Sequence, residues 1–231
     1  FDPATSQKIT GGTLLMGSSD SPASGHVTNC LTGTLHSQIE FEKEGCYDFR
    51  ASGRLNYSRT DRTDVLAKSA SFDPEASLLA RVNVASWLGF EATADWTTQY
   101  YHTLEGVPLG WSLDLIVPSD NQFGPEKASQ YYAGMFMSFE KHRLSLGCYT
   151  KKMKDLVYFT DATSLFSSAA AGWRDKIDIG EGSSKGVEFL YEKAGEKLNY
   201  RIAYTWSKTD RTFQNVNDGV SFPAKFNRPH I

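Results

Sequence analysis

The chain has 231 residues, of which 22% are charged and 13% aromatic, and its formal net charge is −3. This near-neutral balance argues against a nucleic-acid partner, because proteins that bind nucleic acid present a basic face. No run of about 18 apolar residues is present, which excludes a transmembrane helix. The mean hydropathy of −0.42 is compatible with a membrane barrel, in which only every second residue faces lipid.

Two features bear on the cellular compartment. The first residues, Phe1 to Ala4, have neither the basic region nor the apolar core of a signal peptide, so we expect a removed signal or an internal segment of a longer protein. The three cysteines, Cys30, Cys46 and Cys148, lack the spacing of a metal site. A Cys30–Cys46 bridge in an oxidising compartment and unpaired cysteines remain alternative interpretations.

A period of two in hydrophobicity predicts β-strands throughout the chain. In residues 90–101, for example, Phe90, Ala92 and Trp96 alternate with Glu91 and Asp95. Taken in chain order, the pattern predicts about eight strands, at residues 35–42, 47–58, 76–85, 90–101, 130–139, 143–153, 185–192 and 198–207.

The length and charge of these strands favour a membrane barrel. Several approach or exceed ten residues, whereas strands of soluble proteins average about five to six and strands that cross a bilayer need about nine to eleven. The polar face also carries charges, among them Arg50, Arg54, Glu91, Asp95 and Arg201. We therefore predict an all-β, antiparallel up-and-down transmembrane β-barrel whose apolar face meets lipid and whose polar face lines a wet lumen.

The predicted connections alternate in length. Tight turns are expected at residues 42–45, 86–89, 140–142 and 194–197, and long segments at roughly 59–74, 102–128, 155–184 and from 209 onward. Short turns on one side and long loops on the other are typical of outer-membrane barrels. Aromatic residues are expected on the apolar face near strand ends, where they would meet lipid headgroups: Tyr47, Tyr57, Phe90, Tyr100, Tyr131, Phe139, Tyr200 and Trp206.

No pattern of enzyme chemistry is found, and we expect neither catalysis nor a cofactor nor a metal. Motifs of serine hydrolases, zinc proteases and phosphate-binding loops are absent. The glycine-rich run at 180–186 leads into a strand pattern instead of a helix. The acid pairs Asp73/Glu75 and Asp175/Asp178 are interpreted as residues of solvated loops.

Candidate ligand-binding residues are Tyr100, Tyr101, His102 and Trp111. His102 falls where a strand leaves the membrane, although a loop histidine without a role is the commoner case. The segment 102–128 is apolar for an exposed loop, with Trp111 in its middle. It is predicted either to line a ligand vestibule or to pack against neighbouring loops.

A succession of motifs over residues 70–231 resembles one family. It includes Val107-Pro108-Leu109-Gly110, Asp114-Leu115-Ile116-Val117-Pro118-Ser119, Tyr149-Thr150-Lys151-Lys152-Met153, Lys185-Gly186-Val187-Glu188 and Phe222-Pro223-Ala224-Lys225-Phe226-Asn227-Arg228-Pro229-His230. The order is similar to the middle and later barrel of TonB-dependent outer-membrane receptors, in the form with a carboxypeptidase-like regulatory domain. The final motif is a partial match, because the family more usually has an Asp-Arg-Arg-His-like run.

The resemblance implies a barrel of about 22 strands, of which residues 1–231 are a portion without the plug domain. It further implies a location in the bacterial cell outer membrane and active uptake of a nutrient such as a peptide, glycan or iron complex. The implied partners are outer-membrane lipid, TonB through a missing N-terminal region, and a surface lipoprotein. The alternatives are a self-contained eight-stranded outer-membrane barrel with a structural or adhesion role, and a soluble lipocalin-like binder.

Overall fold

The computed structural model describes residues 8–10, 27–62, 68–104, 115–159, 177–195, 198–225 and 227. Eight long strands of 12 to 18 residues dominate it: β2 (Val27–Lys43), β3 (Tyr47–Arg62), β4 (Lys68–Ala85), β5 (Leu88–Gln99), β8 (Glu126–Phe139), β9 (His142–Phe159), β10 (Ile177–Lys193) and β11 (Tyr200–Phe213). The short elements are β1 (Lys8–Thr10), β6 (Tyr101–Leu104), β7 (Leu115–Pro118), β12 (Phe222–Pro223) and a 3-10 helix (Asn217–Gly219).

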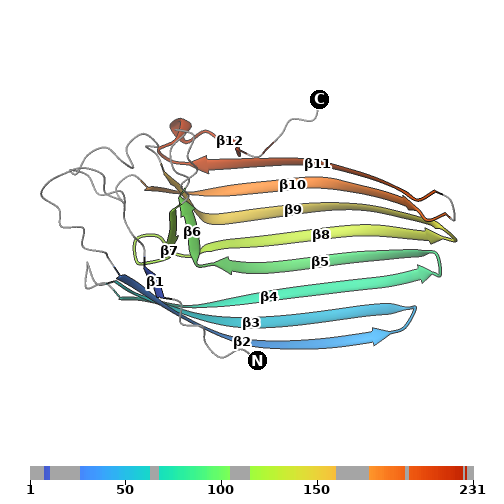
Figure 1. Cartoon of the computed structure of the whole chain (residues 1–231), viewed down its shortest axis with the longest axis horizontal. Coiled ribbons are helices and arrows are strands. Elements are labelled where there is room, and N and C mark those ends of the chain that lie inside the picture. Colours follow the sequence, from blue (N-terminus) through green and yellow to red (C-terminus); the bar gives the residue numbers. More distant parts are fainter. Residues whose placement is uncertain are drawn as a thin grey trace, which may run out of the picture.

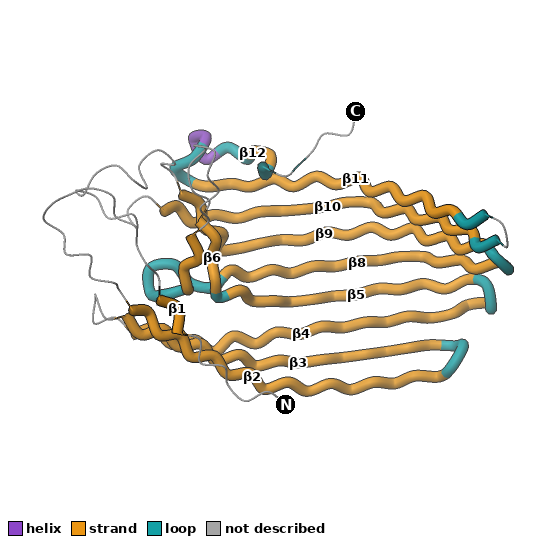
Figure 2. Tube along the Cα trace, in the orientation of Figure 1, coloured by secondary structure: helices purple, strands orange, loops and turns teal. Residues whose placement is uncertain are grey.

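The long strands form one antiparallel sheet in chain order. The order is β1-β2-β3-β4-β5-β8-β9-β10-β11-β12, and every neighbouring pair is antiparallel. Figures 1 and 2 show the strands side by side as a single layer. The all-β, up-and-down antiparallel prediction is thus confirmed, and the sheet that the described residues form is open.

Tight turns gather at one end of the sheet (Figure 1). The predicted turns at 42–45, 86–89 and 140–142 are confirmed, and the first contains Gly45 at φ 72°. That left-handed conformation suits a residue without Cβ, so glycine permits the turn at this position. The predicted turn at 194–197 is described only at Ala194 and Gly195.

The opposite ends of the strands extend into segments predicted as long loops. β3 continues to Arg62 and β4 begins at Lys68, so most of the segment 59–74 is strand. β9 continues to Phe159 and β10 begins at Ile177, which shortens the predicted loop 155–184. These predicted boundaries were wrong because the hydrophobic alternation stops before the hydrogen-bonded ladder does: β3 ends in the polar run 58–62, whereas β9 ends in the consecutive apolar residues 156–159.

Between β5 and β8 the chain forms a separate hairpin. β6 pairs with β7 from Tyr101↔Pro118 to Leu104↔Leu115, in a two-stranded sheet of its own. In Figure 1 this hairpin lies at the loop end, across the ends of the long strands. The predicted segment 102–128 therefore begins and ends as ordered structure.

The described residues form no second layer over the sheet, and its apolar side chains are mostly exposed. Among described residues, the buried hydrophobic side chains are Phe123, Leu156, Phe213 and Ala224, whereas 25 large hydrophobic side chains are exposed. Water-soluble domains bury one face of a sheet against another layer. In the described part of this chain, the apolar side chains of the sheet are not covered by such a layer.

The strand arrangement also decides the cysteine alternatives. Cys30 pairs with Thr60 at the loop end of β2, whereas Cys46 lies in the turn at the other end of that strand. A disulfide requires the two Cα atoms to lie within about 7 Å. The Cys30–Cys46 bridge is therefore excluded, and Cys46 and Cys148 are free, exposed thiols.

Candidate functional site

One face of the sheet, here called the apolar face, carries every exposed large hydrophobic residue of the long strands. The strand register places these residues in one row across β2 to β11: Phe41, Phe49, Ala80, Ala92, Ala133, Cys148, Val187 and Trp206. Because side chains alternate along a strand, residues two positions away from this row share its face. Ile39, Leu78 and Tyr204 are examples, with exposed fractions of 57%, 46% and 55%.

The loop-end limit of this apolar band crosses the sheet obliquely. Among the described side chains, the last exposed large hydrophobic residue is Leu31 in β2, ten positions beyond Phe41, and Trp206 in β11, which shares the row of Phe41; Ile179 of β10, 42% exposed, lies separately beyond this limit. Ten residues correspond to about 33 Å along a strand, and seven strand-to-strand steps to about 34 Å across the sheet. The strands therefore incline at about 45° to the band, close to the tilt of about 35–45° in membrane barrels.

Aromatic rings follow the loop-end limit of the band. Tyr57 and Phe72 face each other across β3 and β4 with ring centroids 4.8 Å apart, and Trp96 and Tyr131 meet edge to face as diagonal neighbours on β5 and β8 at 5.9 Å. The turn end has its own pair, Trp87 stacked on Phe139 at 5.1 Å. Aromatic rows at both limits of an apolar band are typical of the headgroup layers of a membrane. Tyr100, predicted in this row, instead points its hydroxyl at Asp73.

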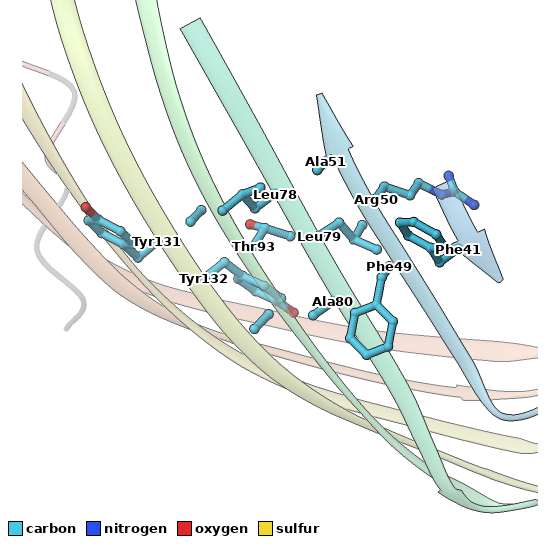
Figure 3. A pocket seen from close by; sticks show the side chains of 12 residues that line it. Phe41, Phe49, Arg50, Ala51, Leu78, Leu79, Ala80, Thr93, Tyr131 and Tyr132 are labelled. Carbon is cyan, nitrogen blue, oxygen red and sulfur yellow. The ribbon is translucent and has the colours of Figure 1, made fainter. Parts of the chain in front are cut away.

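A shallow hollow interrupts the apolar face (Figure 3). It has a volume of about 570 Å³ and is lined by small side chains between large ones. Ala51, Ala80, Ala92 and Ala94 contribute the small side chains, and Phe41, Phe49, Leu78 and Tyr131 are among the large ones. A flexible hydrocarbon chain suits such an open, apolar depression better than a compact polar ligand does, because the lining offers almost no hydrogen-bonding groups.

The opposite, polar face is held by ion pairs between strands. Arg50 Nε lies 2.8 Å from Glu40 Oε1, its direct partner in the ladder, and Arg81 Nε lies 2.8 Å from Glu91 Oε2. Further pairs of the same kind are Arg54–Glu75 at 3.5 Å, Arg143–Glu192 at 3.8 Å and Arg201–Glu192 at 3.4 Å. Opposite charges directly across a sheet are stabilising. Such a surface suits water, not lipid.

Aromatic side chains on the polar face lie over glycines of neighbouring strands. A Cβ built on Gly147 would lie 2.6 Å from Tyr132 Cε2, and one built on Gly186 would lie 2.6 Å from Tyr149 Cε1 and 2.7 Å from the Trp206 carbonyl oxygen. The rings occupy the space that larger residues would need. At these positions the rings lie flat over the glycine backbone, and no side chain projects between them and the sheet.

At the loop end, Tyr100 joins three strands. Its hydroxyl donates a 2.9 Å hydrogen bond to Asp73 Oδ2 of β4, while Lys127 Nζ of β8 lies 3.2 Å from Asp73 Oδ1. Burial, followed by the hydrogen bond to Asp73, raises the pKa of the Tyr100 phenol. Asp73 is only 5% exposed. Its interpretation as a solvated loop residue was wrong, because β4 extends past it.

His102 lies at the centre of a buried cluster that fastens the β6–β7 hairpin. Its Nε2 is 3.1 Å from Ser119 Oγ and its Nδ1 is 3.2 Å from Glu126 Oε1. The Ser119 hydroxyl donates its one hydrogen to the Tyr100 carbonyl at 2.9 Å, so Oγ accepts from the imidazole. The order of residues matches a serine–histidine–acid triad, but in this arrangement the imidazole does not activate the serine. The His102 ring has no exposed surface.

Phe123 completes this cluster. It is 1% exposed, meets the His102 ring edge to face at 5.5 Å, and packs against Val157 of β9 and Ile177 of β10. The hairpin and the segment after it are thereby anchored to three long strands. The result is a fixed rim at the loop end of the sheet.

The structure places three of the four predicted ligand residues together at the loop end. Tyr100 and His102 make rim contacts, Tyr101 begins β6, and Trp111 lies outside the described residues, as do both predictions for its loop. Sequence reasoning missed Ser119, Phe123 and Glu126, and it assigned Asp178 to a loop although β10 includes it. Asp178 is 7% exposed, and its Oδ2 accepts a 2.7 Å hydrogen bond from the backbone N–H of Asn215.

The described residues contain neither a metal cluster nor a helix that could span a membrane. Within the described ranges, no three His, Cys, Asp or Glu side chains are grouped so as to hold a metal ion. No described helix has the length and apolarity needed to cross a membrane. Comparisons with models of known protein families, with curated protein sequences and with solved structures found no match.

Proposed function

We propose that this chain is part of the wall of an outer-membrane β-barrel that takes up a nutrient through a TonB-dependent receptor. The observation that carries the membrane part is the oblique apolar band with aromatic rows at its limits. Its inclination of about 45° is what strand tilt in a barrel produces. The sequence resemblance over residues 70–231 supports the receptor part, with a peptide, glycan or iron complex as the transported ligand.

In this proposal the two faces have separate tasks. The apolar face contacts lipid hydrocarbon, and the ion-paired polar face lines the aqueous interior. The rim around His102 holds the β6–β7 hairpin at the mouth, where a ligand arrives first. No bond of the ligand needs to be made or broken, because uptake depends on binding and on a gated passage.

The membrane part is tested by thiol labelling of adjacent residues. Ala92→Cys and Thr93→Cys are each introduced with Cys30→Ser and Cys148→Ser, so that Cys46 in the turn serves as the internal standard. In isolated outer membranes, a charged, water-soluble maleimide is expected to label Cys46 and the thiol at position 93, and a lipid-soluble maleimide the thiol at position 92. Equal reaction of positions 92 and 93 with the water-soluble reagent would contradict the proposal.

The receptor part is tested by size and partner. The native protein in outer membranes is expected to run as a heat-modifiable band far above 25.7 kDa and to cross-link to TonB. A heat-modifiable band near 25.7 kDa that does not cross-link would instead support the self-contained barrel. Recovery only in the aqueous fraction would favour the soluble binder.

A further inference from the structure

Two basic side chains on the polar face differ from the ion-paired arginines of that face. Arg211 of β11 and Lys151 of β9 are both partly buried, and neither has an ion pair within the described ranges. The Nε of Arg211 is buried and has no hydrogen-bond acceptor among the described residues. By contrast, Arg50 and Arg201 each lie beside a glutamate. A buried donor without an acceptor is unfavourable unless a bound group satisfies it.

The strand ladder explains why Arg211 has no partner. Its direct neighbours are Gly182 of β10, which has no side chain, and Phe222 of β12. Phe222 belongs to an aromatic cluster with Phe213 and Tyr158, in which the ring centroids lie 5.0 to 6.2 Å apart. This cluster borders Arg211 on its loop-end side and supplies no negative charge.

Two hydroxyl groups lie in the same row of the sheet as Lys151. The register runs from Lys151 to Ser184 of β10 and on to Thr209 of β11. Ser184 Oγ and Thr209 Oγ1 lie 2.8 Å apart, and only one hydrogen can lie between them, so the other hydroxyl can donate to a further group. Arg211 is the next residue on this face after Thr209. These four side chains are called the basic cluster: Lys151, Ser184, Thr209 and Arg211.

The acids on the polar face do not neutralise the basic cluster. Asp95 lies in the same row but two strands away from Lys151, and it accepts a 2.5 Å hydrogen bond from Ser77 Oγ. Glu188 lies four residues from Ser184, toward the turn end. Asp178, toward the loop end, accepts hydrogen bonds from the Asn215 and Ile179 backbone and from the Asn215 side chain.

Two other acids are close in sequence but lie on the opposite face. Asp210 precedes Arg211 and pairs with Lys208, and Glu181 precedes Gly182. Because side chains alternate along a strand, both carboxylates project away from the basic cluster. The cluster therefore keeps two positive charges that no described residue neutralises.

This arrangement suits an anionic group with several oxygens. The Nε–H and one terminal N–H of an arginine form a planar fork that matches two oxygens of a carboxylate or a phosphate. The Lys151 ammonium adds a second charge, and the free hydroxyl hydrogen of Ser184 or Thr209 adds a neutral donor. Side chains on neighbouring strands start about 5 Å apart, within the reach of lysine and arginine.

We propose that the basic cluster binds an oxyanion group, a carboxylate or a phosphate, of the solute that the barrel takes up. Binding supplies the acceptor that the buried Nε of Arg211 lacks. The role in uptake rests on the proposed function, whereas the affinity of the cluster for anions needs no membrane. In the proposed barrel the cluster faces the interior, three residues toward the loop end from the row of Trp206.

The test measures the binding of citrate and of inorganic phosphate to the full-length protein in mild detergent, by isothermal titration calorimetry. The site variant is Lys151→Gln with Arg211→Gln. The matched control is Lys152→Gln with Arg201→Gln, which also removes one lysine from β9 and one arginine from β11 but leaves the cluster intact. Loss of charged hydrogen-bond donors is expected to weaken binding of the preferred anion roughly 10- to 100-fold in the site variant, whereas the control is expected to bind like the unaltered protein.

Two further arms identify the chemistry. Tighter binding of citrate assigns a carboxylate, and tighter binding of phosphate assigns a phosphate. The uncharged trimethyl ester of citrate is expected not to bind. Equal affinity of the site variant and the control, binding of the ester as tightly as citrate, or no binding of either anion at millimolar concentration would each overturn the proposal.

Failure of this inference is distinguishable from failure of the proposed function. Heat-modifiable mobility verifies that each variant is folded. If the thiol at position 92 is reached only by the lipid-soluble reagent while the site variant binds both anions normally, the membrane location stands and the anion site falls. If the water-soluble reagent reaches position 92 while the site variant loses anion binding, the anion site stands and the proposed function falls.

Discussion

Replacing Ala92 with arginine tests how deeply the apolar band lies in lipid. In β5 the band extends from Leu88 to Trp96, and Ala92 is its middle residue. Four residues on each side correspond to about 13 Å along the strand, or about 9 Å from each limit at a tilt of 45°. The whole band is then about 19 Å high, somewhat less than the roughly 25 Å of membrane barrels. In the proposed barrel, Ala92 would therefore lie near the bilayer midplane.

The expected cost follows from that depth. Ala92→Arg should lower the free energy of unfolding by about 2–4 kcal/mol, the cost of arginine at the bilayer midplane. Ala70→Arg, on the same face but beyond Phe72, should cost less than about 1 kcal/mol because the charge reaches the interface. Thr93→Arg faces the aqueous side and should be nearly neutral.

The assay is urea unfolding of the protein in phosphatidylcholine vesicles, followed by tryptophan fluorescence and heat-modifiable mobility. The three variants share the substituted side chain, so differences report position. If Ala92→Arg and Thr93→Arg differ by less than about 0.5 kcal/mol, a value within the usual scatter of surface substitutions, the apolar face is not in lipid.

Three further predictions concern packing and the rim. Gly186→Ala should lower the free energy of unfolding by about 1–3 kcal/mol, because the new Cβ meets a backbone carbonyl. Gly53→Ala, whose Cβ would have no atom within 4 Å, should leave it unchanged. Urea unfolding of both variants measures the difference. His102→Ala removes the imidazole partner of the buried Ser119 hydroxyl and of the partly exposed Glu126, at about 1–3 kcal/mol. It should speed proteolysis within the β6–β7 hairpin while leaving the long strands protected, and unchanged cleavage would contradict the fastening role. Because folding raises the pKa of Tyr100, the protonated phenol stabilises the folded protein fully below the unfolded pKa of about 10, and this stabilisation is lost as the pH rises above it. Tyr100→Phe should therefore make the free energy of unfolding decline less steeply between about pH 9.5 and 11. An identical decline in the two proteins would show that ionisation of the buried Tyr100 phenol is not its source.

The sequence predicts strands well only where their two faces differ. In β5, Phe90, Ala92 and Trp96 alternate with Glu91 and Asp95, and that contrast exists because one face meets a different environment from the other. In β9, Lys152 and Lys154 lie on the same face as Cys148, so hydrophobicity no longer alternates. The hydrogen-bonded ladder continues there regardless, because backbone groups pair without reference to side-chain polarity.

The contacts of the rim could not be predicted from a local sequence pattern. His102 meets Ser119 and Glu126 at separations of 17 and 24 residues, and those contacts depend on the β6–β7 hairpin crossing the strand ends. A period of two carries no information about that crossing. For the same reason Tyr100 was placed on the apolar face, although the sheet strand ends at Gln99.

The long ends of the strands determine where a solute first meets the protein. β9 continues eleven residues past Cys148, to Phe159. At about 3.3 Å per residue and a tilt of 45°, this part of the wall would rise roughly 25 Å above the hydrocarbon layer. The entrance of a barrel built from such strands would stand clear of the lipid headgroups as a stiff collar. A solute too large to approach the membrane surface would still reach the mouth, and the loops above it would be presented to the surroundings at a constant height.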